Sequence, residues 1–253
     1  MFITLMTTIF CLFSYSSVYA GDIILNAEKN VEYHQKEQKL VANGNAIATK
    51  DDMSIKADTL IGFYAPKSKS KISRMEARGN IHMKSPETEA WGDHLIYDNK
   101  TNVVTLKGNP SKIKKTDTTI TALGDIIYYR NEQKAVATNN VTAVDSNGNT
   151  VSSDTMTAYF SPNTSGKILL NKIDLYQNVK IITPDAIINA DKGTYYAIDK
   201  KIELFDNVII NQKGNILKGS KAETNLNTGI SKMLSDGKKG RVSGIFKEKK
   251  KKD

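Results

Sequence analysis

The stretch Lys201-Ile202-Glu203-Leu204-Phe205-Asp206-Asn207-Val208-Ile209-Ile210 alternates apolar and polar side chains and carries an Asn directly before a Val. Five further copies of this pattern occur in the chain. The residues equivalent to Val208 are Ala46, Ile81, Pro110, Val141 and Val179, and each of them follows an Asn. Alternation with a period of two places alternate side chains on opposite faces of a β-strand. Each copy is therefore predicted to be a strand with one apolar face.

The copies recur every 29 to 38 residues, a spacing typical of stacked supersecondary units. Between them lies a second recurrent element, a small residue and an Asp followed by a Tyr, as in Ile55–Asp58 with Tyr64. Each unit is thus two strands joined by a polar turn, and the units must share one apolar interior. We expect an all-β chain of about 14 to 18 short strands from Ile23 to Phe246, with a possible joint between two stacked modules near residues 111–118.

The two ends of the chain differ from this body. Residues 1–20 contain no charged side chain, and Val18-Tyr19-Ala20 before Gly21 fits a signal-peptide cleavage site. We predict cleavage after Ala20; the alternative is an uncleaved membrane anchor. Residues 247–253 form a basic tail that we expect to be disordered.

The net charge of +9 is concentrated at the C-terminal end. Lys238 to Asp253 contribute +6 of it and leave the body with +3, so a nucleic-acid partner is not expected. The only cysteine, Cys11, lies in the signal segment, so a cleaved chain would contain no disulfide.

Motifs for catalysis or metal binding are not recognisable in this sequence. The three histidines are His34, His82 and His94, and no third ligand accompanies the last two, which we interpret as solvated strand positions. We therefore expect no metal, no cofactor and no enzymatic activity. A carbohydrate-active β-helix enzyme would need clustered carboxylates, and the candidates are Asp58, Asp93, Asp125, Asp154 and Asp191. Their even spacing argues for a feature of the repeat instead.

Two features of the repeat allow more than one interpretation. The recurring Asn is expected to hold a strand kink, and the alternative is contact with a polar ligand. Small inward residues such as Ala42, Ala46, Ala77 and Ala137 are compatible with a narrow packed core. They are equally compatible with an inner wall that leaves room for acyl chains. The sequence does not decide between a filled and an open interior.

The unit Ala-Asp…Tyr…Gly-Asn-Val/Ile resembles the repeats of the OstA-like, LptA-type periplasmic lipopolysaccharide-transport family. The clearest matches run from Ile55–Asp58 to Gly79-Asn80-Ile81 and from Ala190-Asp191 to Asn207-Val208, and the closing run Arg241–Phe246 is similar to that family's ending. The chain departs from the pattern by its length and by residues Asn139, Gln177 and Asp206, which replace the Gly before Asn. We expect this loss of Gly to alter the bend of those strands.

The resemblance implies a continuous, twisted β-jelly roll that carries lipopolysaccharide through the periplasm, with the acyl chains of lipid A inside and the sugars outside. It also implies inner-membrane and outer-membrane transport components as partners and head-to-tail homo-oligomers. The alternatives are a ligand-free β-solenoid acting as a scaffold or adhesin, or an inner-membrane-anchored partner of the same fold. The residues expected to line the lipid-binding interior are Leu40, Met75, Ile81, Met83, Val104, Leu106, Val141, Ile173, Leu175, Val179, Ile181, Ile202, Leu204, Val208 and Ile210.

Overall fold

The chain folds into one large antiparallel sheet of eighteen strands, as seen in a computed structural model that describes residues 23–65, 68–164, 166, 168–225, 227–228, 230–235 and 241–246. The all-β prediction is confirmed. Within these ranges there is no helix of the length and apolar character needed to cross a membrane. The predicted signal peptide at 1–20 and the basic tail at 247–253 lie outside the described residues.

In chain order the strands are β1 (Ile24–Asn26), β2 (Asn30–His34), β3 (Lys39–Lys50), β4 (Met53–Ala65), β5 (Ser68–Lys84), β6 (Thr88–Asp98), β7 (Val103–Lys107), β8 (Ser111–Lys115), β9 (Thr118–Ala122), β10 (Ile126–Tyr129), β11 (Lys134–Asp145), β12 (Thr150–Pro162), β13 (Ile168–Ile182), β14 (Ala186–Tyr196), β15 (Lys201–Gln212), β16 (Asn215–Asn225), β17 (Ser231–Leu234) and β18 (Ser243–Ile245).

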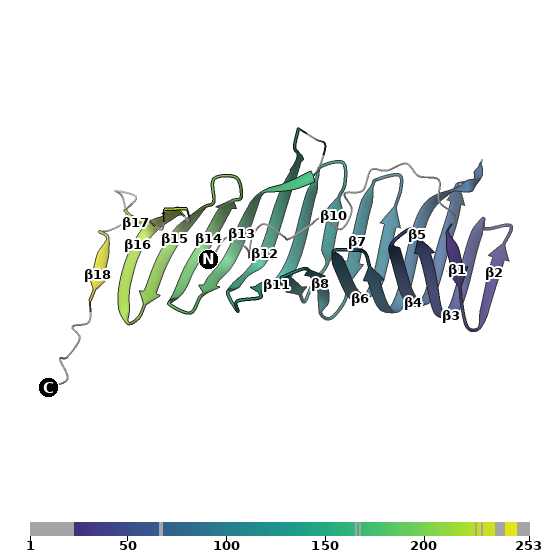
Figure 1. Cartoon of the computed structure of the whole chain (residues 1–253), viewed down its shortest axis with the longest axis horizontal. Coiled ribbons are helices and arrows are strands. Elements are labelled where there is room, and N and C mark those ends of the chain that lie inside the picture. The colour runs from purple at the N-terminus through teal and green to yellow at the C-terminus, as the bar shows by residue number, and fades with distance from the viewer. Residues whose placement is uncertain are drawn as a thin grey trace.

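The strands lie across the long axis of an elongated, twisted body, and most of them pair with the strands that precede and follow them in the chain (Figure 1). Strands β1 and β2 stand at one end, where each pairs with one half of the longer β3. Strands β17 and β18 divide β16 between them at the other end. The sheet is therefore built from long strands whose two halves can pair separately.

A pair of left-handed residues separates the two halves of β3, β5, β11, β13 and β15. In β3 the register against β4 shifts between Asn43 and Ala46, so that Gly44 and Asn45 lie opposite the single residue Asp58. Both residues of the pair have positive φ, at 86° and 41°. The same conformation recurs in the later copies, at Gly79-Asn80, Asn139-Asn140, Gln177-Asn178 and Asp206-Asn207. We call each such pair a left-handed doublet, and the predicted structural role of the repeated Asn is confirmed.

The expectation that loss of Gly would alter the bend is wrong. Asn139, Gln177 and Asp206 adopt φ values of 64°, 62° and 61°, in the same left-handed region as Gly79 at 74°. For residues other than Gly this conformation is unfavourable by about 1–3 kcal/mol of free energy, and interactions in the surrounding structure must offset it. Here the doublet lies between two ladder segments that keep their register on either side of it, and these segments hold the conformation.

The Asn side chains fasten three of the doublets to the preceding strand. The Nδ2 atom of Asn80 donates to Asp58 Oδ2 at 3.0 Å, and Asn178 makes the equivalent bond to Asp154 at 2.8 Å. Asn207 follows the same rule with Asp191 at 2.7 Å. These three Asp residues are therefore acceptors within the repeat, in line with the interpretation that they belong to the repeat and not to one active site.

The third copy of the repeat is the exception, because its strand is interrupted. Strand β7 ends at Lys107 and β8 begins at Ser111, so Pro110 lies at the break. Proline has no N–H to donate to a ladder, and the sequence predicted an edge or a bend here. Strand β6 continues past the break and pairs with both pieces.

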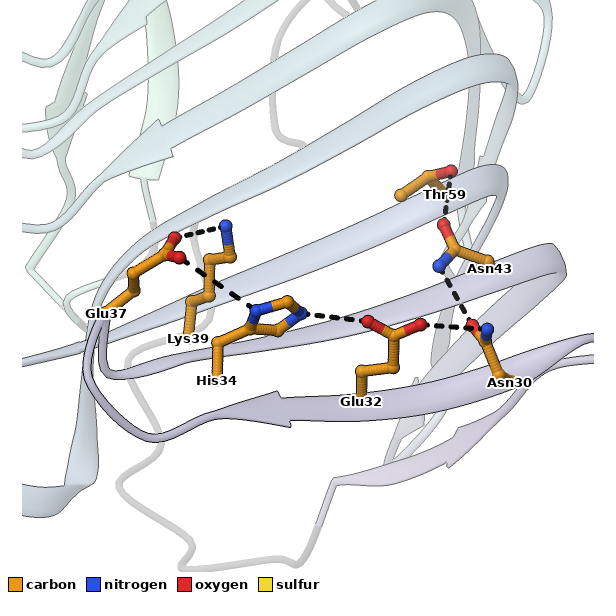
Figure 2. A network of polar contacts seen from close by, with 7 residues as sticks. All are labelled: Asn30, Glu32, His34, Glu37, Lys39, Asn43 and Thr59. Atoms are coloured by element: carbon orange, nitrogen blue, oxygen red, sulfur yellow. Dashed lines mark hydrogen bonds and ion pairs between the residues drawn. The ribbon is translucent and has the colours of Figure 1, made fainter.

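The first end of the sheet is held by polar contacts on β2 and its neighbours (Figure 2). The contacts join Asn30, Glu32, His34, Glu37, Lys39, Asn43 and Thr59. The alternate side chains of β2, Val31 and Tyr33, are 49% and 51% exposed. The ladder described for β2 joins it to β3, and the exposed Val31 and Tyr33 lie at this end of the sheet.

We predict that Gly79→Ala lowers the free energy of unfolding by about 1–3 kcal/mol, because the φ of 74° disfavours Ala and a Cβ there would lie 2.1 Å from Asp58 Oδ2. Gly62→Ala is the matched control, since no atom lies within 4 Å of its Cβ position. Urea denaturation of both variants measures the difference. Equal stability of the two variants would show that the doublet does not require Gly at this position.

Candidate functional site

The doublets divide β3, β5, β11, β13 and β15 into two arms whose apolar side chains face one interior. In β15 the inward residues Ile202 and Leu204 precede the doublet, and Val208 and Ile210 follow it. The first three are buried and Ile210 is half-buried. A two-residue bulge preserves the alternation, so both arms keep their apolar face toward the same side. The result is a folded sheet with an apolar inside and a polar outside.

The structure places the fifteen residues predicted to line the interior in this apolar layer. Eleven of them are buried: Ile81, Val104, Leu106, Val141, Ile173, Leu175, Val179, Ile181, Ile202, Leu204 and Val208. The other four are half-buried: Leu40, Met75, Met83 and Ile210. The half-buried residues belong to β3, β5 and β15, toward the two ends of the sheet.

In the middle of the molecule the interior is filled by its own side chains. One half of the folded sheet contributes Ile113, Val151 and Ile181, all no more than 3% exposed. The other half contributes Tyr128 and Phe160, whose rings meet edge to face with centroids 6.2 Å apart. Between about β8 and β14 the two arms are therefore packed against one another as a solid core.

Near the first end the interior is open. A cavity of about 390 Å³ lies between the arms of β3 to β7, and its lining includes Ile55, Met75, Met83 and Tyr97. A second cavity of about 140 Å³ adjoins it and shares Ile55 and Met75. Ligand pockets typically begin at about 300 Å³. The larger cavity, which we call the entry groove, can therefore hold part of an apolar ligand.

The rim of the entry groove is basic. Lys50, Lys84 and Arg130 are part of its lining, and none of the described lining residues is acidic. The guanidinium of Arg130 is fixed by a hydrogen bond of 3.3 Å from Nη1 to the hydroxyl of Tyr97 and stacks over that ring at 6.0 Å. An apolar cavity beside cationic side chains suits a ligand that joins an apolar chain to an anionic group.

The sequence-based list misses several residues of the groove. Ile55 pairs with Ala48 and Met83 in one inward row, and Tyr97 pairs with Met75 in another. These residues lie on the strands between the Asn copies, and the list was drawn only from the copies. Alternation within the Ile55–Tyr64 element could have identified Ile55. Nothing local in the sequence marks Arg130, which reaches the groove from a turn.

The outer face carries many charged and aromatic side chains, together with isolated apolar ones such as Ile47. The ammonium of Lys134 lies 4.8 Å from the ring centre of Tyr129, and that of Lys172 lies 4.5 Å from the ring centre of Tyr159. These side chains cover one another, and Lys172 also bonds to Asp174 at 2.8 Å. The continuous apolar layer of the sheet is the buried one on the inside.

The amino-acid sequence matches the family model described as LptA/(LptD N-terminal domain) LPS transport protein, over residues 26–134 and again over 124–230. The chain belongs to this family. Among solved structures it is similar to the crystal structure of LptH, the LptA homologous periplasmic component of the conserved lipopolysaccharide transport device from Pseudomonas aeruginosa. That match has 11% sequence identity and a TM-score of 0.23, and it covers 90% of this chain and 96% of the other. No protein with a curated description matches the sequence.

The OstA-like family membership and β-jelly-roll fold expected from the repeats are thus established. The two family matches overlap at residues 124–134, which contain β10 and the start of β11. The joint suggested by the sequence at 111–118 falls instead on β8 and the start of β9. The division of the chain into two modules remains a prediction.

The histidines of this LptA/LptD-type chain stand on the outer face. His82 stacks on Trp91 at 5.0 Å and lies 2.7 Å from Glu89, and His94 lies 3.5 Å from Glu76. Both are about one-third exposed, at 38% and 33%. Nowhere in the described ranges do three His, Cys, Asp or Glu side chains form a group that could hold a metal ion.

Glu76 is a buried carboxylate on this face, with only 4% of its side chain exposed. Arg74 and Arg78 each contact it at 2.6 Å. Burial by itself raises the pKa of Glu76, but the hydrogen bond from Arg78 and the charges of both arginines outweigh burial and lower the pKa. The carboxylate therefore stabilises the fold in its ionised form.

We predict that Glu76→Gln lowers the free energy of unfolding at pH 7 by about 2 kcal/mol. The extra free energy of unfolding that wild type has over Glu76→Gln is fully present above the pKa of a Glu in the unfolded chain, about 4.3. This difference is lost as the pH falls through the lowered pKa of Glu76 in the folded protein. Urea denaturation between pH 3 and 7 measures this dependence. Glu87→Gln is the control, because its side chain is 61% exposed, and a pH-independent deficit for Glu76→Gln would contradict the prediction.

Proposed function

We propose that this protein carries lipopolysaccharide through the periplasm from the inner toward the outer membrane, with lipid A acyl chains shielded in the interior of the folded sheet. The observation that carries the proposal is the entry groove, whose half-buried Ile55, Met75 and Met83 offer an accessible apolar surface on the inside of the folded sheet. Membership in a lipopolysaccharide-transport family supports the same ligand.

The physical need for such a groove is the cost of exposing acyl chains to water. Each methylene group removed from water contributes about 0.8 kcal/mol, so a lipid with many of them does not cross an aqueous compartment unaided. The groove supplies an apolar surface, and its rim of Lys50, Lys84 and Arg130 suits the anionic part of the ligand. The sugars would remain outside, next to the polar outer face. In this proposal the chain acts as a binding protein without catalysis.

Export and partners follow from the same proposal. The first 20 residues would direct the chain to the periplasm and be removed after Ala20. Edge strands with exposed apolar residues, Val31 and Tyr33 at one end and Ile245 at the other, are suited to strand addition between copies. Such head-to-tail contacts would lengthen the apolar interior toward transport components in the two membranes.

A ligand-free scaffold is the second candidate, and the solid core between β8 and β14 favours it. A carrier of this kind must either use only the open end of its interior or separate its arms in the middle. Both candidates share the fold and differ in whether the entry groove contacts lipid, so a direct test of contact separates them.

We predict that a photocrosslinking amino acid in place of Ile55 captures lipopolysaccharide in cells, whereas the same amino acid in place of Ile47 does not. Ile55 lines the entry groove, and Ile47 stands on the outer face of the neighbouring strand with 36% exposure. The measurement is an immunoblot of the irradiated protein with an antibody against lipopolysaccharide. The matched pair keeps residue type and strand environment similar.

We also predict that Ile55→Asp reduces copurified lipopolysaccharide at least about tenfold, since a charge in the groove must be desolvated when an acyl chain binds. Ile47→Asp should leave the amount unchanged. Buried positions such as Val179 are unsuitable for this test, because an Asp there would disrupt the core. Capture at neither position, with unchanged copurification in both Asp variants, would favour the scaffold.

A further inference from the structure

A patch of the outer surface lies across β4, β5, β6 and β8. Lys56, His82, Trp91 and Lys112 stand opposite one another on these four strands and form one cross-strand row. Ala90, the residue before Trp91, is buried. Alternation along the strand therefore places Trp91 and the rest of its row on the outside of the sheet.

A second row runs beside the first, two residues farther from the bend on each strand. It consists of Lys84, Glu89 and Lys114 in register. Lys112 and Lys114 are alternate residues of β8, so their side chains leave the same face about 7 Å apart along the strand. We call the surface that these rows form the basic face, made of Lys56, Lys84, Lys112 and Lys114 around Trp91.

The positive charge of the basic face is not balanced by the protein. In the ranges that the structure describes, no ion pair joins any of its four lysines to a carboxylate. Glu89, the carboxylate within the two rows, contacts His82 at 2.7 Å. On the other half of the outer surface, by contrast, Lys172 is paired with Asp174 at 2.8 Å. The basic face therefore suits an anionic partner.

Trp91 holds part of this surface in place. Its ring stacks on that of His82, with centroids 5.0 Å apart and an angle of 8° between the planes. The ammonium of Lys112 lies 4.8 Å from the ring centre of Trp91 on the other neighbouring strand. A lysine that is already fixed in position loses less conformational freedom when it binds an anion.

The basic face is continuous with the entry groove. Lys84 lines the groove and also belongs to the second row of the basic face. From Lys84 the row crosses β6 to Lys114, a distance of about 10 Å for two strand spacings. The first row continues beyond Lys112 with the hydroxyl side chains of Thr121 and Thr142. A ligand seated in the groove can therefore extend over a surface of ammonium and hydroxyl groups.

We propose that the basic face binds the anionic saccharide part of the lipid whose acyl chains occupy the entry groove. The proposal rests on the lipid-carrier function and specifies where the sugars lie on the outside of the sheet. Phosphate or carboxylate groups on the sugars pair with the lysines. A membrane surface is also anionic, but the connection through Lys84 favours one ligand that occupies both sites, because binding at the groove raises its effective concentration at the basic face.

The test compares lipopolysaccharide with lipid A, which lacks the rest of the saccharide. Affinities of both probes are measured by calorimetry for the full-length protein and for the triple variant Lys56→Gln/Lys112→Gln/Lys114→Gln. Lys84 is left in place because it also lines the groove. Wild type is expected to bind lipopolysaccharide about tenfold more tightly than lipid A, as several exposed charge pairs allow. In the triple variant this preference should fall to within about twofold, with the affinity for lipid A unchanged.

Two further readouts report on the basic face itself. Trp91 is the only tryptophan in the chain, so its fluorescence should change when lipopolysaccharide binds and stay constant with lipid A. Raising the salt concentration from about 0.05 M to about 0.5 M should remove most of the wild-type preference, because exposed charges are screened.

The matched control is Lys134→Gln/Lys192→Gln/Lys213→Gln, which loses the same number of charges elsewhere on the surface. Each of these lysines pairs with an exposed carboxylate. The control should keep the wild-type preference for lipopolysaccharide. Thermal melts should place both triple variants close to wild type, since exposed charges contribute little to stability.

Equal affinities of wild type for the two probes, or a preference that persists in the lysine variant, would refute the role of the basic face and leave the carrier function intact. Vesicles containing phosphatidylglycerol test the other anionic partner. Binding to them that the lysine variant loses, without any preference for lipopolysaccharide over lipid A, would assign the basic face to a membrane surface and overturn the proposal. If wild type binds neither lipopolysaccharide nor lipid A, the carrier function fails together with this inference.

Discussion

The left-handed doublet is the constraint on which the rest of this structure depends. It occurs in β3, β5, β11, β13 and β15, midway along each strand. Two successive residues with positive φ turn the strand and oppose a single residue of the neighbouring strand. The amides of Asn80, Asn178 and Asn207 hold their turns against an Asp of the preceding strand. The sheet folds over its interior because this backbone conformation recurs in successive copies of the repeat.

In the proposed carrier, the interior that results would serve two opposing needs. A solid core stabilises the fold, whereas a carrier requires room for a guest. The molecule divides the two along its length, with aromatic residues such as Tyr128 and Phe160 filling the middle and smaller or flexible ones such as Ala48 and Met83 leaving the first end open. Met is well suited to the open part, because its unbranched side chain adapts to different neighbours.

Much of this architecture could be predicted from the sequence because the signals are periodic. Alternation identified the strands, and the phased Asn identified the kinks. The backbone of the doublet was harder to predict, since Gln177 and Asp206 rarely adopt positive φ and are held there by the ladder on either side.

The candidate site was less predictable than the fold. The fifteen residues predicted to line a lipid-binding interior are all buried or half-buried, and their contact with lipid stays a prediction. Their pattern is the same whether the two arms touch or stand apart. That difference depends on how closely the arms approach, which is a property of the whole sheet. Arg130 was missed for a similar reason, because it enters the groove from a turn outside the repeat pattern.

Pairing between strands that are close together in the chain has a consequence for how the protein is made. Most strands in this sheet form hairpins with the preceding and following strands, so most strand pairs join segments that are close together in the sequence. A chain that emerges end first, from a ribosome or through a membrane, can add one hairpin after another to a growing edge. Assembly in this order keeps the length of unpaired, aggregation-prone strand short at every stage.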